Sequence, residues 1–262
     1  KAKNISVAQG HDNSSSGVTT ITTEVRISST KPWEREQIIL SVDIIAAENY
    51  ASLHSDALKV PGFEVFSFNE KTEKTNKDGV DYTVLKKRWA LFPLISGQHS
   101  IDIPAIEYHK YGKKIRTYYL PTQYVDIVPL PAYIPPTMPV GKINVASGPQ
   151  DNVLLSLDTL YNWDLNLVSY GVSPSWIPSI APQVNTNKSI SFSSKSTAQT
   201  KSFSENGLVN TVKYSIPFKL LESGLISFPK INIQNFDVTS GKIISILHQK
   251  TQMFSIGLVC RA

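Results

Sequence analysis

The stretch DGVDYTVLKKRWALFPLISGQHSIDIPAI, residues 78–106, has a counterpart in NGLVNTVKYSIPFKLLESGLISFPKI, residues 206–231. Each stretch opens on a turn dipeptide, Asp-Gly or Asn-Gly, and continues as a long strand in which apolar and polar residues alternate. A Ser-Gly corner then reverses the chain, and a second strand with a proline follows. Such a repeated β unit predicts tandem domains of one architecture, and it argues against a single catalytic centre.

The composition of the whole chain favours β-structure. Of its 262 residues, 41% are hydrophobic and 18% are charged, so the chain can bury sizeable cores although it carries few charges. Thr, Tyr, Ile and Val, which fit the pleated surface of a sheet, are abundant, and long tracts with helical periodicity are missing. Strands at about ten-residue spacing predict an all-β fold of two tandem immunoglobulin-like β-sandwich domains.

A proline-rich segment, residues 129–139, marks the boundary between the domains. Its five prolines cannot donate to a sheet ladder and favour extended geometry, which predicts a semi-rigid spacer. We expect an N-terminal domain at 1–130, a Pro-rich linker at 131–141 and a C-terminal domain at 142–262. Irregular regions are expected within the domains: a short helix near 48–58, a charged hairpin loop at 71–77, and a serine-rich region at 189–204 that combines a mobile loop with polar strand faces.

The charge of the chain says little about its ligands. The net charge is +5, but the Lys and Arg residues are dispersed. The densest clusters are Lys86-Lys87-Arg88 and the basic residues of 110–116. We expect both clusters at strand ends or a hairpin tip, where charged side chains are solvated and discourage pairing between sheets. No recognition helix or stacking platform accompanies them, so a nucleic-acid partner is not predicted.

Patterns typical of enzymes and metal sites are missing from the sequence. Asp12, Ser14 and Ser16 have the Asp-x-Ser-x-Ser spacing of a metal-ion-dependent adhesion site, but no buried strand precedes them, so we interpret them as a solvated loop. Cys260 is the single cysteine. The histidines lack ligand spacing: His11, His54, His99, His109 and His248. With no phosphate-binding loop or nucleophile elbow either, we expect no enzymatic activity, no cofactor and no bound metal.

Five tyrosines gather on one expected hairpin beside four basic residues: Tyr108, Tyr111, Tyr118, Tyr119 and Tyr124, with Lys110, Lys113, Lys114 and Arg116. Tyr and Arg are over-represented among interface anchors, so one interpretation is a docking edge for a protein partner. The alternative, which the pattern favours, is a cross-strand aromatic ladder that stabilises the hairpin. Under the first interpretation the candidate partner-binding residues are Tyr111, Lys113, Arg116, Tyr118 and Tyr119.

The order of several short motifs resembles the BatD family, the exported "oxygen tolerance" proteins of the Bacteroides aerotolerance operons. The motifs that carry the resemblance are Glu36-Gln37-Ile38, Leu40-Ser41-Val42, Arg88-Trp89-Ala90-Leu91-Phe92-Pro93, Ser96-Gly97, Ile103-Pro104-Ala105-Ile106, Val128-Pro129-Leu130-Pro131, Asn206-Gly207, Ser223-Gly224 and Phe228-Pro229. The chain departs from the family at Arg35-Glu36, where a Gly-Glu pair is expected, and at the second-domain strand, which enters through Tyr161-Asn162-Trp163-Asp164-Leu165 with no Gly-Glu pair. The family's C-terminal membrane segment is also missing from this sequence.

The resemblance implies a periplasmic protein-binding scaffold that is anchored to the inner membrane in its full-length form. It implies partners with von Willebrand-type domains in the membrane, an indirect link to a MoxR-type ATPase, and a role in stress or oxygen tolerance. It implies no catalytic residues. The alternative is a surface adhesin or glycan-binding module that uses a Trp or Tyr ring as a stacking face. The sequence itself shows no signal peptide and no apolar run of about 18 residues that could span a membrane.

Overall fold

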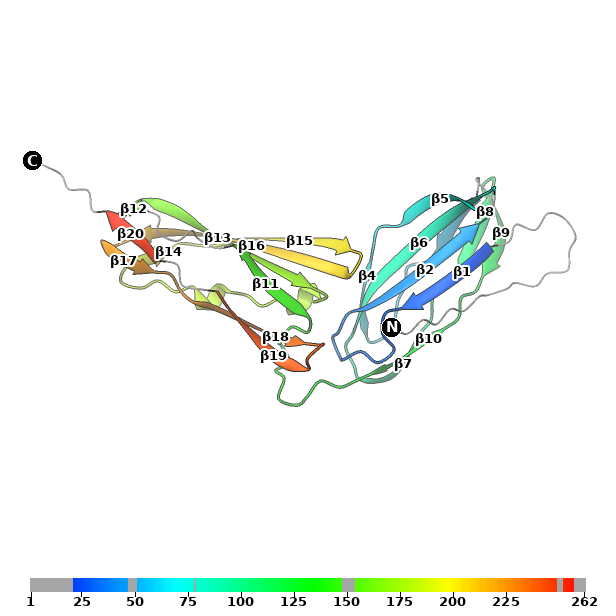
Figure 1. Ribbon diagram of the computed structural model, residues 1–262, viewed down its shortest axis with the longest axis horizontal. Helices are drawn as coiled ribbons and strands as arrows, with labels where there is room; N and C mark the ends of the chain where they lie inside the picture. Colours follow the sequence, from blue (N-terminus) through cyan, green and yellow to red (C-terminus); the bar gives the residue numbers. More distant parts are fainter. Residues whose placement is uncertain (1–20, 47–50, 78, 148–153, 249–251, 257–262) are drawn as a thin grey trace, which may run out of the picture. The chain divides into compact units, whose positions relative to one another are not determined.

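The computed structural model describes residues 21–46, 51–77, 79–147, 154–248 and 252–256 (Figure 1). The chain divides into two compact units, Lys1–Pro131 and Ala132–Ala262, and the division falls inside the proline-rich segment. Nearly every element is a strand, which confirms the all-β sandwich fold. The helical elements of the described ranges are the short 3-10 turns η1 (Pro174–Trp176) and η2 (Ala181–Gln183), and none is long and apolar enough to cross a membrane.

The first unit is built around one large antiparallel sheet with strand order β1-β2-β6-β4, in which β5 also pairs with β6. A two-stranded sheet, β10-β7, and a three-stranded sheet, β3-β8-β9, supply the rest of the sandwich. The strands are β1 (Ile21–Ile27), β2 (Ile38–Ala46), β3 (Ala51–Ser55), β4 (Phe63–Ser67), β5 (Lys71–Lys77), β6 (Val80–Pro93), β7 (Gly97–Ile101), β8 (Ile106–Lys110), β9 (Lys113–Tyr118) and β10 (Gln123–Ile127).

The second unit repeats this order, with a large sheet β11-β13-β16-β14 in which β15 also pairs with β16. Its smaller sheets are β12-β20-β17 and β18-β19. The strands are β11 (Lys142–Ser147), β12 (Leu154–Ser156), β13 (Leu160–Tyr170), β14 (Ile190–Phe192), β15 (Ser196–Ser204), β16 (Gly207–Leu220), β17 (Gly224–Ser227), β18 (Ile231–Asp237), β19 (Lys242–His248) and β20 (Gln252–Ile256). The repeat read from the sequence is therefore a repeat of sheet topology.

The same backbone corner precedes the second strand of each large sheet. Arg35 and Asp158 both have positive φ, 65° and 55°, a conformation that few residues other than glycine adopt readily. The Arg35 amide donates to the carbonyl of Pro93 at 2.8 Å, and the Asp158 amide donates to the carbonyl of Leu220 at 3.2 Å. Pro93 and Leu220 are the last residues of β6 and β16. The two corners are thus equivalent positions of the repeat.

Different side chains complete this corner in the two units. In the first, the Trp33 amide donates to the Glu36 carboxylate at 2.7 Å; in the second, the Ser156 amide donates to the Tyr161 hydroxyl at 2.9 Å. Burial raises the pKa of Glu36 above its ordinary value, and the hydrogen bond from Trp33 opposes that rise. One backbone requirement is therefore met by two unrelated side chains.

The units differ at one sheet edge. In the first unit β3 covers β8, with His54 opposite Glu107. The repeat-equivalent residue of Glu107 is Asn232 in β18, and no third strand of the described chain covers it. Instead the Gln183 side chain donates to the Asn232 carbonyl at 2.9 Å and accepts from the Asn232 amide at 2.7 Å. The side-chain amide of Gln183 thus makes the two backbone hydrogen bonds to Asn232 that a neighbouring strand would make.

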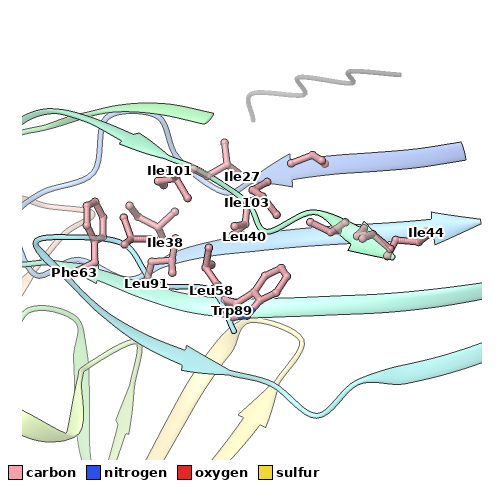
Figure 2. Packing of buried hydrophobic residues seen from close by; sticks show 14 of the residues in the cluster. Ile27, Ile38, Leu40, Ile44, Leu58, Phe63, Trp89, Leu91, Ile101 and Ile103 are labelled. Atoms are coloured by element: carbon pink, nitrogen blue, oxygen red, sulfur yellow. The ribbon is translucent and has the colours of Figure 1, made fainter. Parts of the chain in front are cut away.

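Each unit has its own hydrophobic core. In the first, Ile38, Leu40 and Leu91 of the large sheet pack with Ile101 and Ile103 of the opposite layer (Figure 2). In the second, the core centres on aromatic rings, which meet edge to face because the positive edge of one ring is attracted to the negative face of another. The ring of Phe228 lies 4.9 Å from that of Trp163 and 4.9 Å from that of Phe218, at interplanar angles of 74° and 89°.

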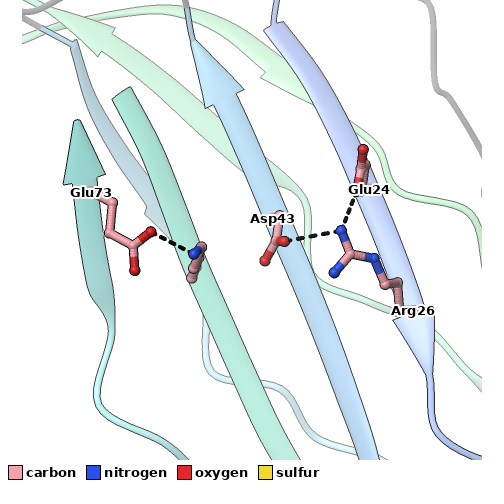
Figure 3. Close-up of polar contacts among 5 residues, drawn as sticks. Glu24, Arg26, Asp43 and Glu73 are labelled. Atoms are coloured by element: carbon pink, nitrogen blue, oxygen red, sulfur yellow. Dashed lines mark hydrogen bonds and ion pairs between the residues drawn. The ribbon is translucent and has the colours of Figure 1, made fainter. Parts of the chain in front are cut away.

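The outer face of the first large sheet is crossed by charged side chains (Figure 3). Glu24 and Asp43 stand directly opposite each other on β1 and β2, a repulsive arrangement for two carboxylates. Arg26 relieves it, because its guanidinium pairs with Glu24 and lies 3.3 Å from the Asp43 carboxylate. Glu73 of β5 pairs with Lys86 of β6 at 2.5 Å. These pairs align neighbouring strands on the solvent side.

Several local predictions are wrong. Residues 51–55 form a strand where a helix was expected, while 48–50 lie outside the described residues. The expected loop at 71–77 is strand β5. In the serine-rich region the expected strand faces are present in β14 and β15, and strand also fills most of the length in which a mobile loop was expected. Both regions form strands because β6 and β16, at 14 residues each, are long enough to pair with two strands along one edge.

The prediction that the cluster Lys86-Lys87-Arg88 lies at a strand end or a hairpin tip is also wrong. The cluster lies within β6, a central strand, and not at a strand end. Lys87 is buried, and its ammonium group lies 2.6 Å from the Glu70 carboxylate and 2.6 Å from the Ser55 hydroxyl. A buried ammonium requires such partners, because desolvation without them is costly.

Part of the segment expected as a linker is packed on the second unit. Met138 and Val140 are buried. Strand β18 holds the chain there: the Phe236 amide donates to the Pro139 carbonyl at 2.9 Å, and the Gly141 amide donates to the Phe236 carbonyl at 3.0 Å. Residues 139–141 are therefore fixed to the second unit by backbone hydrogen bonds.

Candidate functional site

The candidate site is the hairpin formed by β8 and β9. Tyr111 and Gly112 connect the strands, and both have positive φ, 51° and 74°, as the tight turns that suit hairpins require. The register pairs Tyr108 with Arg116 but His109 with Lys114, so Ile115 is an extra residue in β9. Such a β-bulge redirects side chains, and Ile115 is 59% exposed.

One face of the hairpin belongs to the core of the first unit. Tyr108 is buried, and Tyr118 packs against the hydrophobic cluster. The Arg116 guanidinium lies 6.0 Å from the centre of the Tyr118 ring, a distance at which a cation is attracted to an aromatic face. Arg116 and Tyr118, two of the five predicted docking residues, thus make contacts within the hairpin and with its core.

The other face of β8 and β9 carries a polar cluster. Lys114 forms an ion pair with Glu107, and the Nε2 atom of His109 lies 3.2 Å from the same carboxylate. These contacts, that of Lys114 first, lower the pKa of Glu107 below its ordinary value. His54 of β3 meets His109 edge to face, with ring centres 4.8 Å apart. No pattern in the sequence predicts that these two histidines are neighbours, because sheet pairing brings them together across 55 residues of chain.

The remaining predicted residues are exposed and lie at opposite ends of β9. Tyr111 and Lys113 are at the turn, and Tyr119 follows the far end of the strand. Tyr111 is 83% exposed and Tyr119 79% exposed. Lys113 is exposed at the start of β9. Together with Ile115 these side chains form what we term the hairpin-tip surface: Tyr111, Lys113, Ile115 and Tyr119. At the turn it presents a tyrosine ring and a cation, and farther along β9 an isoleucine side chain and a second tyrosine ring. Tyrosine is over-represented among protein interface anchors.

Tyr124, which the sequence grouped with this hairpin, lies elsewhere. It belongs to β10, pairs with Ser100 of β7, and is 74% exposed on the face of that two-stranded sheet. The five neighbouring tyrosines of the sequence are thus divided among the core, the hairpin tip and a separate sheet.

The described part of the chain has no group of three His, Cys, Asp or Glu side chains arranged to hold a metal ion. The motif Asp12, Ser14 and Ser16 and the single cysteine, Cys260, lie outside the described residues. Their interpretation stays a prediction from the sequence.

Comparison with known proteins leaves the family open. No protein-family model matches this chain, and none of the curated proteins matches it. Among solved structures, the adhesin InvE of Yersinia pseudotuberculosis is similar at 8% identity and a TM-score of 0.19, over 88% of this chain and 58% of that one. The Enterococcus faecalis MSCRAMM ACE, described as binding its ligands by the collagen Hug model, is similar at 11% identity and a TM-score of 0.22, over 92% of this chain and 96% of that one.

This chain therefore spans little more than half the length of the Yersinia adhesin. At TM-scores of 0.19 and 0.22, neither likeness carries an argument about what this chain binds.

Proposed function

We propose that this chain is a non-enzymatic protein-binding scaffold that acts in the periplasm as part of a BatD-like membrane complex. Its partners are then membrane proteins with von Willebrand-type domains, with an indirect link to a MoxR-type ATPase. In full length such a protein is anchored to the inner membrane. The complex would serve stress or oxygen tolerance. The hairpin-tip surface is the contact site in this proposal.

The observation that carries the proposal is the exposure of large apolar side chains along the hairpin, from its turn to the far end of β9. Tyr111, Ile115 and Tyr119 are exposed to 83%, 59% and 79% within one short hairpin. Single exposed apolar residues are ordinary on a protein surface, but a group of them beside lysines is typical of a docking surface. The bulge at Ile115 adds to this interpretation, because bulges are common where a strand must present a side chain outward.

A second observation supports the family resemblance. Where BatD proteins are expected to carry Gly-Glu, this chain has Arg35-Glu36. Arg35 has a φ of 65°, in the left-handed region where glycine is the favoured residue. The substitution has therefore kept the backbone conformation for which a glycine would be used.

The proposal is tested by binding measurements on a hairpin-tip variant. Tyr111→Asn with Tyr119→Ala removes both exposed rings, and Asn tolerates the left-handed backbone at position 111. Tyr118 is left unchanged because it packs on the core. We expect the affinity for a purified von Willebrand-type partner domain to fall about tenfold or more, measured by surface plasmon resonance.

The matched control is Tyr124→Ala, which removes an equally exposed ring from a different sheet. It should bind the partner domain as the unaltered protein does. Equal binding by the hairpin-tip variant would remove this surface from consideration, and no binding by the unaltered protein would overturn the proposed partner class.

A further inference from the structure

A surface depression of about 560 Å³ lies on the first unit, beside the two-stranded sheet of β7 and β10. Its volume falls within the range of about 300–1,000 Å³ that is usual for small-molecule sites. Its lining includes Thr30, Lys31, Gln98, Ser100, Tyr124 and Asp126. None of them belongs to the hairpin-tip surface, and the two strands form a separate sheet from β8 and β9.

The register of β7 and β10 places an aromatic ring among short polar side chains. Tyr124 is directly opposite Ser100, and Asp126 is directly opposite Gln98. Because alternate residues of a strand share a face, these four side chains project from the same side of the sheet. The intervening Val125 is buried on the other side. Opposite Tyr124 stands only a serine, so its ring remains 74% exposed.

The chain segment after β1 forms the second wall. The Asp126 amide donates to the Thr30 carbonyl at 2.8 Å, which fixes Thr30 and Lys31 alongside β10. The depression is therefore bounded on one side by β7 and on the other by residues 30–31, with the Tyr124 ring between them.

The lining groups can both donate and accept hydrogen bonds. Gln98, Ser100 and Thr30 carry donors and acceptors, Asp126 accepts and Lys31 donates. In the described ranges the side chains of Gln98, Ser100 and Asp126 have no protein hydrogen-bond partner, so these groups are available to a ligand. One cation and one carboxylate balance each other, which does not favour a strongly anionic ligand.

From these features we propose that the depression binds a neutral glycan, with one pyranose ring stacked on Tyr124. A pyranose has a face of C–H groups, which suits an exposed aromatic ring, and a rim of hydroxyls that donate and accept hydrogen bonds. Ser100, Gln98 and Asp126 lie beside the ring where such hydroxyls would be. This site is separate from the protein-docking proposal and does not depend on it.

The experiment applies the fluorescently labelled chain to an array of neutral, sialylated and sulfated oligosaccharides. The affinity for the strongest ligand is then measured by isothermal titration calorimetry. We expect binding to neutral structures. Tyr124→Ala should weaken it about tenfold, whereas Tyr124→Phe, which keeps the ring, should stay within about threefold of the unaltered protein.

Tyr119→Ala is the matched control, because it removes a ring of similar exposure from the hairpin tip. It should leave glycan affinity unchanged, and circular dichroism melting should show that all three variants fold. The proposal is overturned by an array without any bound glycan, by binding confined to sialylated or sulfated structures, or by full affinity in Tyr124→Ala. Loss of affinity in Tyr119→Ala alone would place the glycan site at the hairpin tip and overturn it equally.

Discussion

Replacing Phe228 by alanine should unfold the second unit at a much lower temperature and leave the first unit unchanged. Phe228 is 3% exposed and meets both Trp163 and Phe218 edge to face. Burial of the side chain contributes about 2–3 kcal/mol, and each of the two ring contacts adds about 1 kcal/mol. The sum, about 4–5 kcal/mol, agrees with the cost of about 3–5 kcal/mol usual for Phe→Ala in a core.

The assay is differential scanning calorimetry combined with hydrogen exchange of peptides from each unit. At about 3–4 °C per kcal/mol for a unit of this size, the transition of the second unit should fall by about 15 °C. Phe228→Leu restores most of the volume but not the ring contacts, so about half of that shift is expected. The repeat-equivalent change, Ile103→Ala, should lower only the transition of the first unit. Equal loss of protection in both units after Phe228→Ala, or a shift below about 5 °C, would refute the reasoning.

Two further predictions concern single polar contacts. The pKa of Glu36 is raised in the folded protein, so ionisation of this carboxyl lowers the stability as the pH rises above the ordinary pKa of 4.5. The amide oxygen of Glu36→Gln can still accept from the Trp33 amide, so this variant should raise the melting temperature at pH 8 and change it little at pH 4. An equal gain at both pH values would contradict this. Gln183→Ala should lower the free energy of unfolding by about 1 kcal/mol and speed hydrogen exchange at the Asn232 amide. As a control, Gln234→Ala, in the same strand as Asn232, should leave that exchange unchanged.

The sequence predicted the parts of the fold that depend on local chemistry. Gly97 and Gly224, the glycines of the two Ser-Gly corners, have φ of 105° and 126°, so the corner pattern reflected a real backbone requirement. The alternation in 82–92 and 208–218 likewise matched the two long strands, because strand periodicity follows directly from which face is buried. Repeated local signals were enough to establish two domains of one kind.

What the sequence missed depends on pairing between distant segments. Strand β5 is highly charged, and strand β15 is mostly polar and exposed along its whole length, so neither shows the apolar alternation by which a strand is recognised. Both form by pairing with a long neighbouring strand. The contact of His54 with His109 arises from register, and no spacing in the chain encodes it. The separation of Tyr124 from the hairpin has the same cause, since a few residues of turn carry the chain to another sheet.

The paired corners at Arg35 and Asp158 bear on how such domains can be recognised at all. What the two units share there is the sign of one dihedral angle and one hydrogen bond from the backbone, while the residues themselves are an arginine and an aspartate. A constraint of that kind leaves the identity of the amino acid almost free. Sequence alignment scores compare side chains. Two copies of this sandwich can therefore diverge until their amino-acid sequences no longer align, while the chain still turns at the same point. Searching for the geometry of the corner would find relatives that searching for its residues would pass over.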